Sequence, residues 1–295
     1  MKIIDSIVFP NSNRIGKSDY CTYYPFNIFF FNMFEYMNLK DITILYGNNG
    51  SGKSTILKVI ARKLDILNDS NFYREVVYKD KETFVPFDIF KDSIIINYNR
   101  DEYSNKQLFP TTIKYITSVD ICKLISNRER YNTRVNIDII GAIDDKKARL
   151  EMGYTYKNID DYDDLARFNA ARKLSTNKYI NRFALKKEDM QSNGETALTY
   201  LTKMFEDGGL YLLDEPENSL SPNFQLELME LISDCAKYFN CQFIIATHSP
   251  LILSLKDAVI YNLDETPVMP RNWVELDNVK LYYDFFKAHK DEFEK

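Results

Sequence analysis

Apolar residues along the chain follow two different spacings, and each spacing predicts one type of element. Short runs rich in β-branched residues, without a helical period, predict strands. From Ser54 the spacing becomes helical and continues to Leu64, shortly after a run that ends at Gly47. The predicted strands of the amino-terminal part are residues 3–9, 41–46, 93–98 and 111–116.

The pattern changes in the middle of the chain and then changes back. Between about residues 120 and 190 glycine is rare, proline is absent, and lysine and arginine are frequent, which predicts a helical subdomain without sustained heptads. Beyond it, residues 210–213 and 243–246 are continuous apolar runs, typical of strands buried on both faces of a parallel sheet. Residues 222–239 between them have helical spacing.

Strands and helices therefore alternate on both sides of an insertion. We predict an α/β protein in which a mixed, largely parallel sheet is flanked by helices. Residues 1–118 and 191–295 are expected to form the α/β core, and residues 119–190 the inserted helical subdomain.

Composition and charge exclude several classes of protein. Apolar residues make up 45% and charged residues 27% of the 295 residues, close to globular averages, so a disordered or fibrous chain is excluded. The net charge of −5 argues against a surface that binds nucleic acid throughout, but permits a local basic patch. Four cysteines without a CxxC pair and two histidines are poor material for a zinc site. No segment approaches the ~20 apolar residues of a membrane span, and the amino terminus lacks a signal-peptide pattern. We expect a cytoplasmic protein without a membrane partner.

The first candidate for chemistry is a loop between a predicted strand and a predicted helix. The chain has only nine glycines, yet three lie within six residues here. The pattern Gly-x4-Gly-Lys-Ser lets backbone N–H groups converge on phosphate oxygens at a helix N-terminus. We expect Lys53 to reach the β- and γ-phosphates of a nucleotide and Ser54 to offer its hydroxyl to Mg²⁺. The nucleotide-binding candidates are Gly47, Asn48, Asn49, Gly50, Ser51, Gly52, Lys53, Ser54 and Thr55.

Acidic residues and a histidine follow the next two buried strands. Asp214 and Glu215 come directly after residues 210–213. Alone this pattern is common, but beside a phosphate-binding loop it predicts that Asp214 helps to hold Mg²⁺ and that Glu215 deprotonates the attacking water. His248 follows the strand at 243–246, at the edge where ligands bind in open α/β sheets. A lone histidine is more often structural, yet this position places it near the γ-phosphate.

A fourth segment, residues 191–195, opens an apolar helix. Taken alone it is a helix N-cap, with Ser192 or Asn193 as the capping residue. From the residues alone, a capping role and a ligand-binding role are equally good interpretations.

Taken in chain order, residues 47–55, 192–195, 210–216 and 247–250 resemble the Walker A, signature, Walker B and switch-histidine motifs of ABC-type ATPases. The runs at 214–222 (Asp-Glu-Pro-Glu-Asn-Ser-Leu-Ser-Pro) and 246–250 (Ala-Thr-His-Ser-Pro) are more similar to the SMC, RecF and OLD-nuclease branch than to transporter subunits. Within that branch the chain resembles the small stand-alone bacterial AAA family ATPases. The resemblance implies a P-loop fold, Mg²⁺ and ATP as cofactors, and a head-to-tail dimer closed around two ATP molecules. It also implies that ATP is contacted from the second subunit by Ser192, Asn193, Gly194 and Glu195.

Three positions depart from the family pattern, and the last two weigh against a transporter subunit. Asn193 stands where the family usually has glycine, and Ser221 stands where transporters carry aspartate. No glutamine follows the strand predicted at 111–116, where Ser118 and Asp120 are the candidates to replace it.

A basic stretch lies in the predicted helical subdomain. From residue 163 to residue 187, seven basic and two acidic residues give a net charge of +5. Such a helical face can follow nucleic-acid phosphates, although a solvated helix or a docking face gives the same pattern. The basic residues are Arg167, Arg172, Lys173, Lys178, Arg182, Lys186 and Lys187.

Three functions remain open from the sequence. We favour a Mg-ATP-dependent ATPase that works as a homodimer or higher oligomer in a DNA-related, repair or antiviral-defence complex, beside a separate effector protein. The second is a nucleotide-sensing regulatory subunit that turns over rarely and holds an effector in check. The third is the nucleotide-binding subunit of a transporter.

Overall fold

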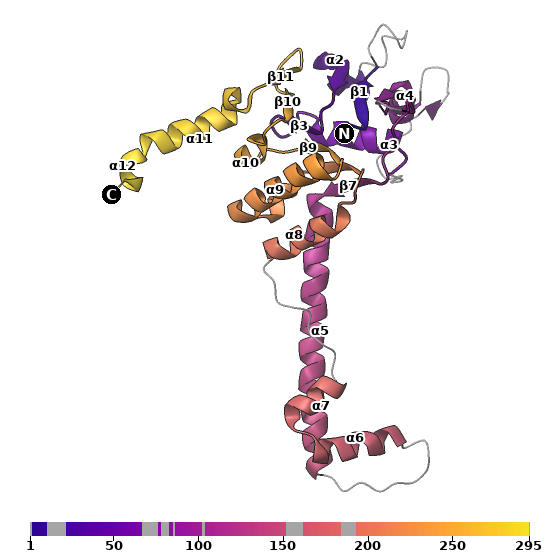
Figure 1. Cartoon of the computed structure of the whole chain (residues 1–295), viewed down its shortest axis with the longest axis vertical. Coiled ribbons are helices and arrows are strands. Elements are labelled where there is room, and N and C mark those ends of the chain that lie inside the picture. The colour runs from indigo at the N-terminus through magenta and orange to yellow at the C-terminus, as the bar shows by residue number, and fades with distance from the viewer. Residues whose placement is uncertain are drawn as a thin grey trace. The chain divides into compact units, whose positions relative to one another are not determined.

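The computed structural model describes residues 2–10, 22–66, 76–77, 83–84, 86–101, 104–151, 162–183 and 193–294. The chain divides into two units, Met1–Ile121 with Ala197–Lys295, and Cys122–Thr196. Figure 1 shows the elements. The strands and short helices before the division are β1 (Ile4–Val8), α2 (Phe26–Phe31), β2 (Tyr36–Asn38), β3 (Ile42–Tyr46), α3 (Lys53–Lys63), β4 (Val76–Val77), β5 (Thr83–Phe84), α4 (Pro86–Ser93), β6 (Ile95–Tyr98) and β7 (Ile113–Thr117).

The remaining elements are mostly helical. Two helices cross the boundaries between the units, and two lie within the second unit. In chain order they are α5 (Ser118–Glu151), α6 (Tyr162–Lys173), α7 (Thr176–Phe183), α8 (Asn193–Met204), β8 (Leu210–Asp214), η4 (Pro216–Ser219), α9 (Pro222–Tyr238), β9 (Gln242–Ala246), α10 (Pro250–Leu253), β10 (Val259–Asn262), β11 (Met269–Arg271), η5 (Trp273–Glu275), α11 (Asp277–Ala288) and α12 (Lys290–Phe293).

A six-stranded sheet forms the centre of the first unit. Among the described residues its order is β11-β10-β3-β9-β8-β7, and every pair is parallel except the edge pair β10–β11. Strands β3, β8 and β9 are buried at every position, as continuous apolar runs require when helices cover both faces of a sheet. The predicted α/β class with a mixed, largely parallel sheet is confirmed.

The register of the sheet aligns the carboxyl ends of its middle strands. Asp214, the last residue of β8, lies opposite Thr117 of β7 and Ala246 of β9. Leu45 of β3 also lies opposite Ala246. The segments that follow β3, β8 and β9 therefore leave the sheet at one edge, and these segments carry three of the four predicted motifs.

A second, three-stranded antiparallel sheet (β2-β1-β6) is joined to the central sheet by buried side chains, among them Gln242 of β9. The Gln242 amide oxygen accepts hydrogen bonds from the backbone N–H groups of Ile3 and Ile4, at 3.2 and 2.8 Å. Its amide nitrogen donates to the carbonyls of Ile4 and Lys40, at 2.9 and 3.0 Å. All polar atoms of this amide are thus satisfied at the start of β9, which fixes the small sheet against the large one.

Helix α2 is an element that the sequence pattern did not predict. It lies in the most apolar stretch of the chain, and its Phe26 and Phe29 are buried against Phe90 of α4 and Phe9. The helix ends after six residues, so it is too short for its period to be recognised in the sequence.

The second unit contains most of α5, a single helix of 34 residues, together with α6 and α7. A small buried group holds α5 and α7 together, in which the Tyr179 hydroxyl donates to Asp145 at 2.5 Å. Lys146 donates to the Leu174 carbonyl at 2.6 Å. In the part of the chain that the structure describes, no helix is both long enough and apolar enough to cross a bilayer.

Candidate functional site

The phosphate-binding loop predicted from the sequence, residues 47–52, joins β3 to α3. Gly52 precedes the helix with a φ of 100°, in the left-handed region that favours glycine. A Cβ at this position would lie 2.6 Å from Cγ2 of Ile28. Any other residue at position 52 would therefore both strain the backbone and displace α2.

Lys53 is the first residue of α3, and its side chain is only 4% exposed. Its Nζ donates to the carbonyls of Gly47 and Asn48, at 2.8 and 3.2 Å, and lies 2.7 Å from Nε2 of His248. Burial lowers the pKa of Lys53, and the nearby Glu215 carboxylate opposes that shift. The ammonium group is thus held inside the curve of the loop, where it can meet phosphate oxygens.

The two predicted metal ligands lie in direct contact. The Ser54 hydroxyl donates to Oδ1 of Asp214 at 2.9 Å, and Asp214 is buried. The second carboxylate oxygen, Oδ2, accepts a hydrogen bond from the Tyr115 hydroxyl of β7 at 2.9 Å. Burial raises the pKa of Tyr115, and the charge of Asp214 raises it further, so the hydroxyl remains a donor. Tyr115 was missed from the sequence because it is one of 21 tyrosines and belongs to no motif.

Replacing Tyr115 with phenylalanine is expected to weaken Mg²⁺ binding. Loss of the hydroxyl leaves Oδ2 of Asp214 without the hydrogen bond that orients the carboxylate, and such outer contacts affect metal affinity by about 10- to 100-fold. We expect the Mg²⁺ concentration for half-maximal ATP turnover to rise about tenfold. Titration of Mg²⁺ at saturating ATP measures this. Tyr238→Phe, on an exposed side chain of α9, is the control and should leave the titration unchanged.

Glu215 and His248, from the ends of β8 and β9, face each other. Oε1 of Glu215 lies 3.2 Å from Nε2 of His248, and Oε2 accepts a hydrogen bond from Asn218 at 2.9 Å. Glu215 has left-handed backbone angles (φ 50°, ψ 54°), and its N–H donates to the Ala246 carbonyl at 2.9 Å. A non-glycine residue in this conformation costs free energy, and such strain is typical of functional sites. The carboxylate is thereby directed to the loop edge and close to Lys53.

Two more side chains that the sequence did not reveal support the loop. Both carboxylate oxygens of Asp264, after β10, lie 2.9 Å from the backbone N–H of Asn48, which donates to them. The Tyr24 hydroxyl, before α2, donates to the Thr55 hydroxyl at 3.2 Å. These contacts join positions that are 216 and 31 residues apart in the chain, so no local pattern could reveal them.

The signature segment is described only in part. Helix α8 begins at Asn193, and Gly194 and Glu195 lie in its first turn, which agrees with the predicted start of a helix. Ser192 lies outside the described residues, as do Lys186 and Lys187 of the basic stretch. A role for these residues at an ATP site remains a prediction.

The described side chains fit a magnesium nucleotide. The Ser51 hydroxyl oxygen is buried in the loop and has no hydrogen-bond partner within the described ranges. A Cβ on Gly50 would meet nothing within 4 Å, so the loop is open at that point. The paired hydroxyl and carboxylate of Ser54 and Asp214 are hard oxygen donors, the type that Mg²⁺ prefers. Together they form an anion-binding loop with a place for a divalent cation.

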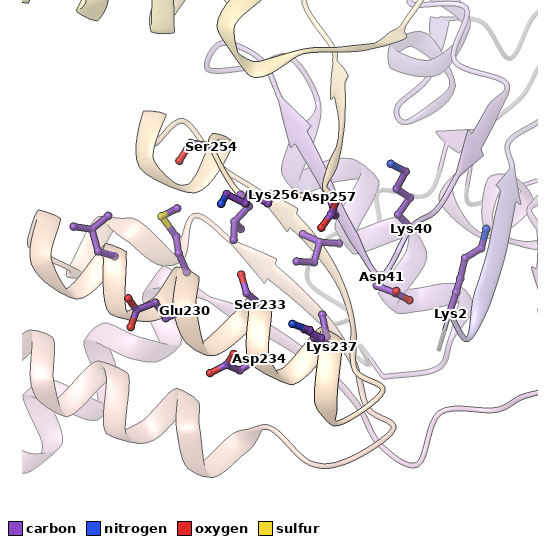
Figure 2. A pocket seen from close by; sticks show the side chains of 15 residues that line it. Lys2, Lys40, Asp41, Glu230, Ser233, Asp234, Lys237, Ser254, Lys256 and Asp257 are labelled. Carbon is purple, nitrogen blue, oxygen red and sulfur yellow. The ribbon is translucent and has the colours of Figure 1, made fainter.

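A separate groove of about 1070 Å³ lies at the other end of the sheet (Figure 2). Ile42, the first residue of β3, lines it, together with Leu226, Met229 and Leu255. Lysine and carboxylate side chains surround it in equal numbers. No predicted site residue lines this groove, so the candidate site is the edge where β3, β8 and β9 end.

Comparison with known proteins agrees with this geometry. Residues 126–254 match the family described as "AAA domain, putative AbiEii toxin, Type IV TA system". The tungstate uptake system ATP-binding protein TupC of Campylobacter jejuni is 23% identical over 267 residues. A probable ABC transporter ATP-binding protein, p29 of Mesomycoplasma hyorhinis, is 22% identical over 258 residues. The chain is similar to ABC-type ATP-binding proteins.

The alignments with these relatives cover much, but not all, of the length of each protein. The alignment with TupC spans 85% of this chain and 66% of TupC, slightly less than two thirds of that protein. The alignment with p29 spans 86% and 82%. Similar solved structures include the SMC head domain from Thermotoga maritima, 15% identical over 89% of this chain and 94% of that one, with a TM-score of 0.39. They also include cbiO1 from Clostridium perfringens, 19% identical over 88% of both chains, with a TM-score of 0.40.

Proposed function

We propose that this protein is an ATPase, which holds Mg-ATP at the edge formed by residues 47–55, Asp214, Glu215 and His248, and hydrolyses it there. The observation that carries the proposal is the convergence of Lys53, Glu215 and His248. Nε2 of His248 lies 2.7 Å from Nζ of Lys53 and 3.2 Å from Oε1 of Glu215. Mg²⁺, held by Ser54 and Asp214, supplies positive charge to the phosphate oxygens. Turnover of ATP by the purified chain, and its loss on chelation of Mg²⁺, is the direct test.

Each residue of the site has a separate task in this proposal. Lys53 binds the β- and γ-phosphate oxygens with an ammonium group that the loop carbonyls hold inside the loop, and a phosphate oxygen replaces one of its present hydrogen-bond partners. The Glu215 carboxylate takes the proton of the attacking water, and Asn218 orients that carboxylate through Oε2. His248, beside both, contacts the γ-phosphate and the same water.

Closure of two copies head to tail completes the site in this proposal. The N-terminus of α8 in the second copy, with Ser192 and Gly194, then contacts the γ-phosphate. Support comes from the helix start at Asn193, because the first N–H groups of a helix have no partner within the helix and can bind an anion. ATP therefore links the two copies, and hydrolysis separates them.

The basic stretch supports a role on nucleic acid. Its five described basic side chains are exposed, and the Arg172 guanidinium stacks on the Phe168 ring at 4.6 Å from the ring centre. We propose that α6 and α7 contact phosphates of DNA or RNA and that the ATPase works in a defence or repair complex beside a separate effector. The matched family's description, which names a toxin–antitoxin system, supports this class of role. The exposed basic residues are Arg167, Arg172, Lys173, Lys178 and Arg182.

Reversing the charge at Arg172 and Lys173 is expected to weaken nucleic-acid binding. Each lost phosphate contact lowers both the affinity and the salt dependence, so we expect the double variant Arg172→Glu/Lys173→Glu to bind a duplex at least about tenfold more weakly. Fluorescence anisotropy with a 30-base-pair DNA and a single-stranded RNA, at two salt concentrations, measures this. Lys237→Glu/Lys256→Glu, which makes the same charge change on exposed residues of the first unit, is the control. Equal weakening in both variants would indicate a nonspecific charge effect and contradict the assignment.

A transporter subunit is the second candidate function, because both curated relatives are named as transporter ATP-binding proteins. The segment after β7 argues against it, because a transporter subunit is expected to carry a glutamine there. This chain has none, and Asp120 is one of the two candidates to replace it. Oδ2 of Asp120 accepts hydrogen bonds from the N–H and hydroxyl of Thr117, at 3.1 and 2.7 Å, so this carboxylate caps the first turn of α5. Turnover that ignores nucleic acid, together with copurification of a membrane protein, would favour the transporter function.

A further inference from the structure

Glu217, two residues after Glu215, carries a buried carboxylate that the proposed chemistry does not use. It lies in the short helix η4 and is 8% exposed. Its Oε1 accepts three hydrogen bonds from consecutive residues of the loop after β9. The donors are the Thr247 hydroxyl at 2.6 Å, the His248 N–H at 2.8 Å and the Ser249 N–H at 3.3 Å.

The peptide groups of His248 are therefore held from two sides. Glu217 accepts from the N–H, and the Asn278 side chain at the start of α11 donates to the carbonyl at 2.9 Å. The next residue is fixed as well, since the Ser249 hydroxyl donates to Gln225 at 2.6 Å and its oxygen caps α10. With the backbone fixed, the imidazole has few positions, and the observed one places Nε2 between Lys53 and Glu215.

We propose that Glu217 is the positioning residue for His248. This inference rests on the proposed role of His248 beside the γ-phosphate and the attacking water. Glu217 touches neither ATP nor water in this proposal. It acts by holding the loop at 247–249, so that Nε2 of His248 stays 3.2 Å from Oε1 of Glu215. A displacement of about 1 Å in such a group can lower a catalytic rate by about 100-fold.

The second oxygen of Glu217 makes a discriminating substitution possible. Oε2 is buried and has no hydrogen-bond partner in the described part of the chain. In Glu217→Gln the amide oxygen can still accept the three hydrogen bonds. The NH₂ group then takes the place of Oε2, where no donor of the described residues lies close enough to repel it. Glu217→Ala instead leaves three donors without an acceptor. The two variants thus differ mainly in whether the loop is held.

The experiment compares kcat for ATP hydrolysis with ATP affinity in a set of variants. We expect Glu217→Ala to lower kcat at least about tenfold while ATP affinity changes less than about threefold. Glu217→Gln should keep at least about a third of the wild-type kcat. Glu227→Ala, on an exposed glutamate of α9, is the control and should match the wild type. Thr247→Val removes one donor without changing the side-chain shape, and it should lower kcat about threefold even if Glu217→Ala does not fold.

A double variant separates positioning from a general loss of structure. If Glu217 acts through His248, Glu217→Ala/His248→Ala should be no slower than His248→Ala alone. Losses that multiply, or an unchanged kcat in both Glu217→Ala and Thr247→Val, would overturn the inference while leaving the ATPase function intact. A wild-type chain that binds ATP but does not hydrolyse it, or a His248→Ala variant with full kcat, would contradict the proposed function itself.

Discussion

Glu215→Gln is expected to abolish almost all ATP turnover while keeping ATP bound. The amide has the size of the carboxylate and can still accept the Asn218 hydrogen bond through its oxygen. It cannot take a proton from water, and loss of a general base costs about 100- to 10,000-fold in rate. Because the γ-phosphate then persists, the head-to-tail dimer should accumulate. Single-turnover hydrolysis and solution mass with and without Mg-ATP measure both effects.

The control for this variant is Glu230→Gln, an exposed position on α9. It should hydrolyse ATP like the wild type, and its gain in mass with Mg-ATP should be no larger than that of the wild type. If Glu215→Gln doubles in mass only with Mg-ATP, both the base and the contact in trans are supported. A Glu215→Gln chain that binds ATP yet keeps its mass would contradict dimer closure for the isolated protein. Full turnover in this variant would remove Glu215 from the mechanism.

Lys53→Ala is expected to prevent ATP binding. The ammonium group is the positive charge closest to the loop carbonyls, and a hydrogen bond to a charged group contributes about 1.5–3 kcal/mol. Its loss should raise the dissociation constant for Mg-ATP by at least about 100-fold. Isothermal titration calorimetry with Mg-ATP measures the change directly.

Lys63→Ala, in the last turn of the same helix, is the matched control for Lys53. Its Nζ contacts only the Asp92 carbonyl among the described residues, at 3.3 Å, on an exposed surface. We expect this variant to bind ATP normally. The thermal midpoint of Lys53→Ala should not fall, because a buried charge with a lowered pKa is removed. ATP affinity unchanged in Lys53→Ala would contradict the phosphate-binding role of the loop.

The positions of the main catalytic candidates could be predicted because they depend on short-range patterns. Each candidate directly follows an apolar run: a glycine-containing loop follows the first, two carboxylates the second and a histidine the third. When the three runs form parallel strands, the segments that follow them lie at the same edge of the sheet. The register bears this out, with Asp214 opposite Ala246. The fold class follows from the same continuous apolar runs.

The supporting residues could not be predicted, because each is a single side chain brought in from far along the chain. Tyr115 lies on β7 and contacts Asp214 on the adjacent parallel strand β8, although the two residues are 99 positions apart in sequence. Asp264 and Asn278 belong to segments with no motif of their own, and only the tertiary fold shows that they hold the loops around Lys53 and His248. Glu217 belongs to the acidic run that was recognised, but its hydrogen bonds to the next strand's loop are visible only in the folded chain.

The strand order has a consequence for how this protein is made. β3, which carries the phosphate-binding loop, lies between β9 and β10, and both of these strands come about 200 residues later in the chain. At translation rates of about 5–20 residues per second, β3 leaves the ribosome about 10–40 seconds before its neighbours exist. During that interval the backbone N–H and C=O groups along both of its edges are open to wrong pairing. A nascent or truncated chain that stops before residue 242 therefore contains the complete loop sequence but not the sheet that shapes it, so the loop takes its final form only in the last stage of folding.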